Sequence, residues 1–265
     1  MRRTQEEKAA AFRELHEAEP FIIPNPWDAG SAKVLEALGF RALATTSSGL
    51  AFTMGRPDGG ATLDEVVAHV REVDAATSLP VSVDLEHGYG RDPEAAAVAI
   101  TRVAGAGAVG GSIEDYDPSG EIYGVDRAAE RVAAAAGAAR SLGFPFTLTA
   151  RAENHIRGNP DLEDTIARLQ AYERAGADVL YAPGLRTAEE IRAVCSAVSR
   201  PVNVLARPGL SMRDIADAGA QRVSVGGALA WAAVEAMAAA AEQMRDSGDF
   251  SGLRPADRIR GWLAG

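Results

Sequence analysis

The stretch Pro80-Val81-Ser82-Val83-Asp84-Leu85-Glu86-His87-Gly88-Tyr89-Gly90 begins as a β-branched apolar run and ends in two acids and a glycine-containing turn. Side chains on a strand alternate between its two faces, so Asp84 and Glu86 are predicted to point the same way. Two neighbouring carboxylates repel each other and are costly to bury without a partner. The pair therefore predicts a divalent-cation site at the end of a strand.

A second pattern recurs along the chain: a helical segment ends in glycine, and an apolar strand begins two or three residues later. Glycine at that point supplies the left-handed residue that closes a helix. The glycines in this position are Gly39, Gly107, Gly143, Gly176 and Gly219. With three further apolar runs, the pattern predicts eight strands, at residues 21–24, 42–46, 81–86, 109–114, 146–150, 179–182, 202–205 and 223–225.

Each predicted strand is followed by a helical pattern, and strands that are apolar throughout are buried on both faces. These features predict an α/β chain that forms one (β/α)₈ barrel domain over residues 1–265, with a short N-terminal helix at residues 4–18. The other helices are expected at residues 28–38, 62–76, 93–105, 127–141, 161–175, 187–198, 211–218 and 228–245. A doubly wound open sheet is the alternative, which the lack of a Gly-x-Gly-x-x-Gly motif after the first strand disfavours.

The composition excludes several classes of function. The 265 residues include 37 acidic and 27 basic side chains, and a formal charge of −10 argues against a nucleic-acid partner. Cys195 is the single cysteine, so no disulfide framework exists and a reducing cytoplasm is expected. No apolar run approaches the about 20 residues that span a bilayer, and the first residues lack the apolar core of a signal peptide. We therefore expect a cytoplasmic protein with no membrane partner.

Functional residues of such a barrel lie at the carboxyl ends of its strands and in the loops that follow. Four acids from three adjacent units occupy these positions: Asp58, Asp84, Glu86 and Glu114. Hard oxygen donors without a cluster of His or Cys select Mg²⁺ or Mn²⁺ rather than Zn²⁺. We take Asp84, Glu86 and Glu114 as the candidate metal residues, and Asp58 as a residue that faces the substrate.

Other side chains at these strand ends suit an organic anion. Arg151 can hold a carboxylate bidentately. Ser47, Ser48 and Gly49 are expected to form a turn that offers hydroxyls and backbone N–H groups to a carboxylate or an oxyanion. Trp27 is a candidate pocket wall. Together these residues indicate a site for a small metal-chelating 2-oxo acid whose enolate a metal would stabilise, the intermediate shared by decarboxylation and retro-aldol cleavage.

At this point the motifs are similar to a known family. They are Pro24-Asn25-Pro26-Trp27-Asp28-Ala29, Thr46-Ser47-Ser48-Gly49, Gly55-Arg56-Pro57-Asp58, Val83 to Gly90, Ser112-Ile113-Glu114-Asp115 and Thr149-Ala150-Arg151. Between about residues 20 and 240 the chain resembles the isocitrate lyase/phosphoenolpyruvate mutase superfamily. The resemblance implies a barrel with a swapped last helix, usually a tetramer. It also implies Mg²⁺ bound directly by Asp84 and largely through water by Asp58, Glu86 and Glu114, with the 2-oxo acid held by the segment 47–49 and Arg151.

One loop departs from the family pattern. Isocitrate and methylisocitrate lyases carry a Lys-Lys-Cys-Gly-His loop after Ile-Glu-Asp, whereas residues 116–124 here contain no cysteine. The resemblance implies that this loop supplies the proton-transfer group, and Tyr116, Glu121 and Tyr123 are the candidates. Gly120 and Gly124 could serve as hinges of a lid. The departure disfavours isocitrate lyase activity and fits the branch that contains oxaloacetate decarboxylases.

The sequence thus predicts a Mg²⁺-dependent carbon–carbon lyase, a carboxy-lyase or oxo-acid lyase. Its substrate would be a small 2-oxo or 2-hydroxy di- or tricarboxylic acid, and its assembly a homo-oligomer, either a dimer or a tetramer. Two alternatives stay open. One is P–C bond chemistry on a phosphoenolpyruvate-like substrate, and the other is a non-catalytic protein that binds a 2-oxo acid.

Overall fold

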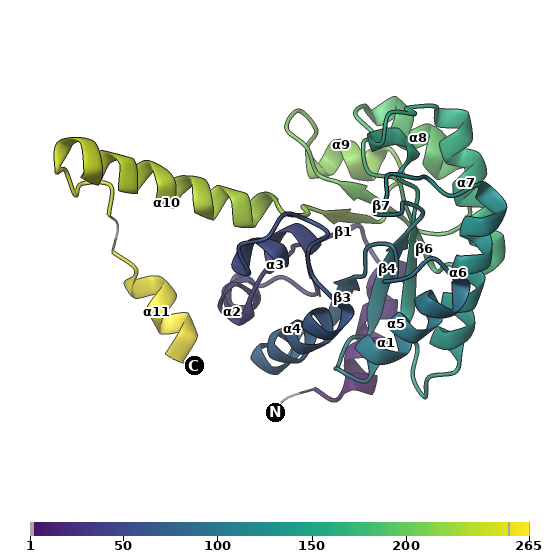
Figure 1. Cartoon of the computed structure of the whole chain (residues 1–265), viewed down its shortest axis with the longest axis horizontal. Coiled ribbons are helices and arrows are strands. Elements are labelled where there is room, and N and C mark those ends of the chain that lie inside the picture. The colour runs from purple at the N-terminus through teal and green to yellow at the C-terminus, as the bar shows by residue number, and fades with distance from the viewer. Residues whose placement is uncertain (1–2, 254, 265) are drawn as a thin grey trace.

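The computed structural model describes residues 3–253 and 255–264, and its centre is a ring of eight parallel strands with helices outside (Figure 1). The strands are β1 (Phe21–Ile23), β2 (Leu43–Ala44), β3 (Val81–Asp84), β4 (Gly110–Glu114), β5 (Thr147–Arg151), β6 (Val179–Tyr181), β7 (Val202–Leu205) and β8 (Arg222–Ser224). Neighbours pair in chain order from β2 to β8, and β8 pairs with β1. The Ala44 amide donates to the Pro24 carbonyl at 3.1 Å, which links the ends of β1 and β2. The predicted (β/α)₈ barrel is confirmed.

The helices follow the strands as predicted, with two additions. They are α1 (Gln5–Glu17), α2 (Ala29–Ala37), α3 (Ser47–Thr53), α4 (Leu63–Ala76), α5 (Pro93–Ala104), α6 (Val125–Arg140), the short 3₁₀ helix η1 (Asn154–Ile156), α7 (Leu162–Ala175), α8 (Ala188–Ala197), α9 (Met212–Asp217), α10 (Ala228–Ser247) and α11 (Asp257–Ala264). The additional α-helices are α3 and α11. Four of the five predicted helix-ending glycines have positive φ, and Gly143 does not.

Helix α1 closes the amino-terminal end of the barrel, where the strands begin. Thr4 caps it in a capping box with Glu7. Its buried face includes Phe12 and Leu15, which belong to one apolar cluster with Phe21 and Val109 at the strand starts. With this end plugged, ligands reach the barrel interior from the carboxyl ends of the strands.

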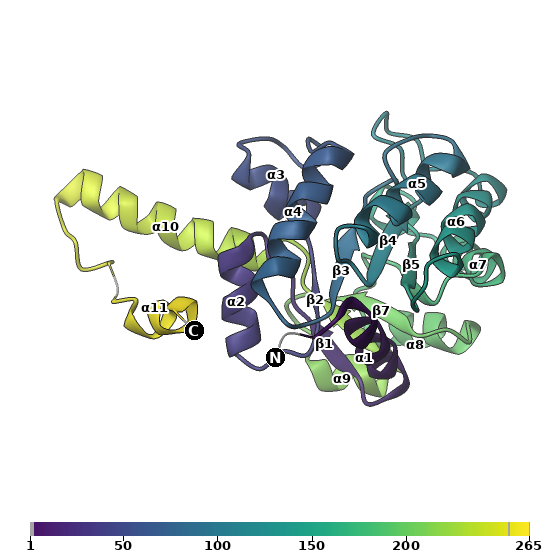
Figure 2. The ribbon, with the colours of Figure 1, turned by 90° about the horizontal axis from the view of Figure 1, so that it is seen from below.

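Helix α10 leaves the barrel instead of packing against it (Figures 1 and 2). Of its 20 residues, Ala230 is the one that is buried. Large apolar side chains on it are exposed, among them Trp231 and Met237, and on the barrel Ile22 of β1 is also exposed. Helix α11 contacts α2. None of the helices in the described residues combines the length and the hydrophobicity needed to cross a bilayer.

Candidate active site

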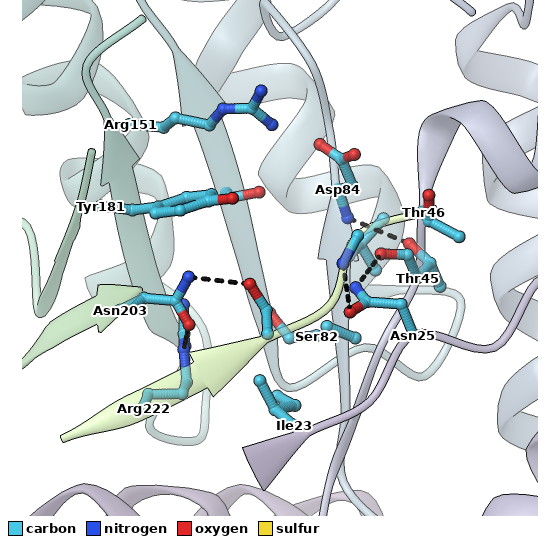
Figure 3. A pocket seen from close by; sticks show the side chains of 15 residues that line it. Ile23, Asn25, Thr45, Thr46, Ser82, Asp84, Arg151, Tyr181, Asn203 and Arg222 are labelled. Carbon is cyan, nitrogen blue, oxygen red and sulfur yellow. Dashed lines mark hydrogen bonds between the residues drawn. The ribbon is translucent and has the colours of Figure 1, made fainter. Parts of the chain in front are cut away.

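A polar pocket opens at the carboxyl ends of the strands and continues along the barrel axis. Its cavity volume is about 50 Å³. Figure 3 shows the Arg151 guanidinium and the Asp84 carboxylate at one end, and Arg222 and Ile23 at the other, with the Tyr181 ring in between. The mouth of the pocket therefore presents one cationic and one anionic side chain to the same ligand.

Asp84 is the last residue of β3, and backbone amides fix its carboxylate. Its Oδ2 accepts a hydrogen bond from the Ser47 amide at 3.1 Å, and its Oδ1 accepts one from the Glu86 amide at 3.3 Å. The Ser47 amide belongs to the first turn of α3, whose N-cap is Thr46. A carboxylate at a helix N-terminus is stabilised by the free N–H groups and by the helix dipole. Asp84 therefore stays oriented toward the pocket.

The segment 47–49 forms the start of a helix, not the open turn that the sequence predicts. Thr46 accepts from the Gly49 amide and so begins the helix. A Cβ on Gly49 would lie 2.7 Å from Thr46 Cγ2 and 2.8 Å from Trp27 Cβ. Only glycine allows α3 to approach the end of β1 so closely, which explains why a residue typical of turns lies in this helix.

Glu86 lies beyond the end of β3, which ends at Asp84. Strand alternation, from which its orientation was predicted, therefore does not orient it. Its φ is 48°, a left-handed conformation that is uncommon for residues other than glycine and recurs at functional sites. The Tyr89 hydroxyl, in the same turn, donates to Glu86 Oε1 at 3.0 Å. Burial first, and then the charges of Asp84 and Asp58, raise the pKa of Glu86 to about 7. The left-handed turn thus places this carboxyl near the other acids.

Glu114 and Arg151 are partners in the register of β4 and β5, and Arg151 Nη1 lies 3.5 Å from Glu114 Oε2. Burial, together with Glu153 and Asp84, raises the pKa of Glu114, while Arg151 lowers it. Burial alone would lower the pKa of Arg151, but Glu114 and Glu153 raise it above its ordinary value. The Arg151 guanidinium also lies 5.3 Å from the ring centre of Tyr181. Arg151 is therefore a fixed cation at the pocket mouth.

Glu153 forms an ion pair with the Nε edge of Arg151. Its side chain has 0% exposure; one oxygen accepts from Arg151 Nε, and the other accepts from Arg157 Nε at 3.0 Å. The Glu153 amide donates to Asp115 Oδ1 at 2.7 Å. Asp115 is itself buried and accepts from Arg168 at 2.9 Å. Buried charged residues behind Arg151, namely Glu153, Asp115 and Arg168, therefore fix the position of its guanidinium.

The loop between β4 and α6 folds into a small hairpin in which Tyr116 pairs with Ile122. The Tyr123 side chain is buried, and its hydroxyl donates to Asp117 at 2.8 Å within the loop. Glu121 is exposed and forms an ion pair with Arg91. The Tyr116 ring lies 3.8 Å from the Arg157 guanidinium carbon. Of the three predicted proton-transfer candidates, Tyr116 is the one whose side chain contacts Arg157, while the Tyr123 backbone contacts Asp115 and Arg168.

The donor set fits a hydrated magnesium ion better than a metal enclosed by protein ligands. Within residues 3–253 and 255–264, no three His, Cys, Asp or Glu side chains lie close enough to hold a metal ion by themselves. Mg²⁺ keeps several waters and binds through one or two carboxylates, unlike a structural zinc ion. Burial and the charge of Asp84 raise the pKa of both Glu86 and Glu114, and a nearby cation would offset this effect. Asp84, Glu86 and Glu114 are therefore suited to hold such an ion.

Of the predicted substrate residues, Arg151 lines the pocket, whereas Ser47, Ser48, Gly49, Trp27 and Asp58 do not. Trp27 lines a separate apolar cavity of about 580 Å³ formed with α2, α10 and α11. Asp58 is exposed in the loop before α4 and acts on the site through its charge near Glu86.

Three residues of the site received no role from sequence reasoning: Tyr89, Glu153 and Tyr181. Glu153 stands after predicted strand 5, but the sequence gives no sign that it pairs with Arg151 and Arg157, and Tyr181 lies within predicted strand 6. For Tyr89, the feature of the sequence that points to the site is its position three residues after Glu86, in the motif at residues 80–90.

Comparisons with known proteins agree with this geometry. A family model described as phosphoenolpyruvate phosphomutase matches residues 12–245. An oxaloacetate decarboxylase of Rhodopseudomonas palustris is 33% identical over 209 residues, which cover 75% of this chain and 70% of that protein. Among solved structures, a candidate lyase or mutase of Burkholderia cenocepacia is 52% identical with a TM-score of 0.96, covering 98% of both chains.

A more distant structure shows a ligand. The structure of an oxaloacetate acetylhydrolase in complex with its product oxalate is 25% identical with a TM-score of 0.87, covering 97% of this chain and 94% of that one. The region matched by the family model, residues 12–245, contains all eight strands and every strand-end residue of the pocket. The chain therefore belongs to the phosphoenolpyruvate phosphomutase family, within the phosphoenolpyruvate mutase/isocitrate lyase superfamily.

Proposed function

We propose that this protein is a Mg²⁺-dependent lyase that breaks a C–C bond in a small 2-oxo or 2-hydroxy di- or tricarboxylic acid. Decarboxylation of an oxaloacetate-type substrate is the favoured reaction. The observation that carries the proposal is the placement of Arg151 and Asp84 at the same mouth of the pocket (Figure 3). A ligand there can give a carboxylate to the arginine and its other oxygens to a cation beside Asp84. The relationship to an oxaloacetate decarboxylase supports the choice of reaction.

Each residue has a distinct task in this proposal. A divalent cation, when bound, supplies a Lewis acid for the carbonyl and carboxylate oxygens of the substrate. Asp84 anchors that cation, and Glu86 and Glu114 orient its waters. Arg151 binds the substrate carboxylate bidentately and is kept charged by Glu114 and Glu153. Thr45 and Thr46 line the other side of the pocket.

Decarboxylation of a 2-oxo diacid breaks the bond between C3 and C4. The electron pair of that bond forms the enolate of pyruvate, CO₂ leaves, and C3 then receives a proton. We assign the proton transfer to the loop at residues 115–124, where the Tyr116 ring stacks on Arg157, the ion-pair partner of Glu153. Alanine at Tyr116 is expected to lower turnover while ligand binding persists, whereas alanine at Glu121 is expected to leave turnover unchanged.

P–C bond chemistry is the second candidate, because the matching family model is a phosphoenolpyruvate phosphomutase. Its substrate would carry a phosphonate or phosphate ester in place of the distal carboxylate. Incubation with phosphonopyruvate, followed by ³¹P spectroscopy, separates the two chemistries. A signal that moves between the phosphonate and phosphate-ester positions supports this candidate, and an unchanged spectrum supports C–C cleavage.

We also infer that the chain assembles with copies of itself. A largely exposed helix with apolar residues such as Trp231 and Met237, which points away from its own barrel, needs a partner surface. Exchange of α10 between two copies would cover this helix, and it would cover exposed Ile22 on the barrel wall. Dimers or tetramers of this kind are the expected state.

A thermal-shift panel tests the proposed function directly. The protein is heated with and without Mg²⁺ in the presence of oxalate, pyruvate, oxaloacetate, malate, isocitrate or phosphonopyruvate. A ligand that binds only the folded state raises the melting temperature. Metal-dependent stabilisation by oxalate or a 2-oxo acid, with CO₂ release from oxaloacetate, is the expected result. The control for an Asp84→Asn variant in this panel is Asp64→Asn, which changes an exposed acid on α4 and should behave as wild type. Absence of any shift in the wild-type protein would refute the proposal.

If ligands bind without turnover, the protein is a 2-oxo acid binder rather than an enzyme. The same panel distinguishes these outcomes, because a stabilising ligand that remains chemically unchanged points to binding alone.

A further inference from the structure

Arg157 is a second guanidinium close to Arg151, although it does not line the pocket itself, and neither the family motifs nor the proposed reaction uses it. It follows η1, six residues after Arg151, and its side chain is 37% exposed. It shares the carboxylate of Glu153 with Arg151, since each arginine donates its Nε–H to a different oxygen of that group. The two cations are therefore held side by side by one buried acid.

The orientation of Arg157 leaves one hydrogen-bonding edge available. Tyr116 covers one face of the guanidinium, with 3.8 Å from the guanidinium carbon to the ring centre. The Nε edge is used by Glu153. In the part of the chain that the structure describes, Nη1 and Nη2 have no protein acceptor within hydrogen-bond distance. These are the two nitrogens that bind a carboxylate bidentately.

The surrounding charges favour an anionic ligand group at this edge. Arg151 is flanked by two acids, Glu114 and Glu153, whereas Arg157 is paired with Glu153 alone. Arg157 pairs with the same buried carboxylate as Arg151, so this guanidinium lies near Arg151 and not on a remote surface, and its charge lowers the pKa of the buried Glu114. An exposed cation with a fixed plane and a free edge is a pre-organised anion receptor.

We propose that Arg157 binds the distal carboxylate of a dicarboxylic substrate while Arg151 holds the proximal one. This inference rests on the proposed function and sharpens it, because it selects dianionic 2-oxo or 2-hydroxy acids over monocarboxylic ones. The Tyr116 ring, which belongs to the loop at residues 115–124, then packs against the guanidinium of this subsite. The loop residue Tyr116 and the residue proposed to select the substrate are in direct contact.

A matched pair of stable ligands tests the proposal. Malate and 2-hydroxybutyrate share the carboxylate and hydroxyl that meet Arg151 and the cation, but 2-hydroxybutyrate has a methyl group in place of the distal carboxylate. Calorimetric titration in Mg²⁺ buffer gives the affinity of each ligand for the wild-type protein, Arg157→Gln and Arg157→Lys. Arg102→Gln, which removes an exposed arginine paired with Asp64 on the outer helices, is the control for a change in net charge.

Arg157→Gln is expected to weaken malate binding by roughly 10- to 100-fold, because a charge-assisted hydrogen-bond pair is lost. Binding of 2-hydroxybutyrate should be unchanged, and Arg157→Lys should recover part of the malate affinity. An equal loss for both ligands would show that Arg157 acts only by positioning Glu153 and Arg151, which overturns the proposal. Unchanged malate affinity overturns it too. If the wild-type protein binds neither ligand in Mg²⁺, the proposed function fails first and this subsite fails with it.

Discussion

Replacement of Glu153 by glutamine tests whether this buried acid supports the Arg151 clamp. Glutamine has nearly the same size, so the change removes the charge and leaves the packing. In the wild-type protein both carboxylate oxygens accept from guanidinium groups, and the side chain has 0% exposure. A glutamine amide has one oxygen acceptor, and its NH₂ group would face a second donor. One of the two arginines therefore loses its acceptor.

The size of the effect follows from burial. Removal of one partner of a buried ion pair costs roughly 3–5 kcal/mol, because the remaining charge stays desolvated. Arg151 keeps Glu114 at 3.5 Å, and Arg157 is 37% exposed, so water compensates part of the loss. We expect the free energy of unfolding to fall by about 3 kcal/mol, a large share of the roughly 5–15 kcal/mol typical of a folded protein.

Urea titration at pH 7, followed by circular dichroism, measures this change for Glu153→Gln and for the control Glu121→Gln. Glu121 is 60% exposed in its pair with Arg91, and exposed pairs contribute at most about 1 kcal/mol. The steady-state rate with oxaloacetate should also fall in Glu153→Gln, since Arg151 loses its fixed orientation. If the two variants differ by less than about 1 kcal/mol, Glu153 does not support the clamp as the ion-pair geometry indicates.

Three further predictions concern the metal, His16 on α1 at the amino-terminal end of the barrel, and the assembly. Asp84→Asn should abolish the stabilisation by Mg²⁺, about 2.7 kcal/mol at a hundred times the dissociation constant, and retained metal-dependent stabilisation would remove Asp84 from the site. Burial and Arg222 hold the pKa of His16 at about 3, so the neutral ring is favoured in the folded state. Stability should therefore fall by up to about 1.4 kcal/mol per pH unit between pH 6.5 and 3. His16→Asn, which keeps a donor for the Phe12 carbonyl, should lose this component of the pH dependence, and an unchanged slope in urea titrations would contradict it. Met237→Glu on α10 should yield smaller particles than wild type in light scattering, whereas an unchanged mass would exclude this face from the interface.

The barrel was predictable from the sequence because its signals are local. Eight apolar runs, five of them preceded by a predicted helix-ending glycine, identified all eight strands, and the structure pairs them in the expected order. The turn after β3 was not predictable in the same way. Strand alternation orients a residue only while the strand continues, and β3 ends at Asp84, so the left-handed conformation of Glu86 decides where its carboxyl lies.

Helix α3 shows a second limit of sequence reasoning. Residues 47–53 contain two serines and a glycine, which favour turns over helix. The helix forms because Thr46 caps it and because Gly49 allows close packing on Trp27. The cap is a local interaction, whereas the packing on Trp27 joins two separate segments of the chain, and together they override the weak local preference. The consequence for the site is that Asp84 receives an amide from a helix N-terminus rather than from a flexible turn.

The contacts around Arg151 indicate how a rigid barrel can support a variable specificity. Asp84 and Arg151 stand on neighbouring parts of one sheet, and backbone register fixes their positions. Arg157 and Tyr116 stand on loops; Arg157 is joined to Arg151 through the shared carboxylate of Glu153, and Tyr116 packs on Arg157. Changes in these loops can alter which distal group is recognised without moving the residues proposed to bind the cation and the proximal carboxylate. Substrate choice and bond cleavage are therefore expected to separate in mutants, with Arg157 variants changing affinity by ligand and Asp84 variants removing metal-dependent chemistry for all ligands alike.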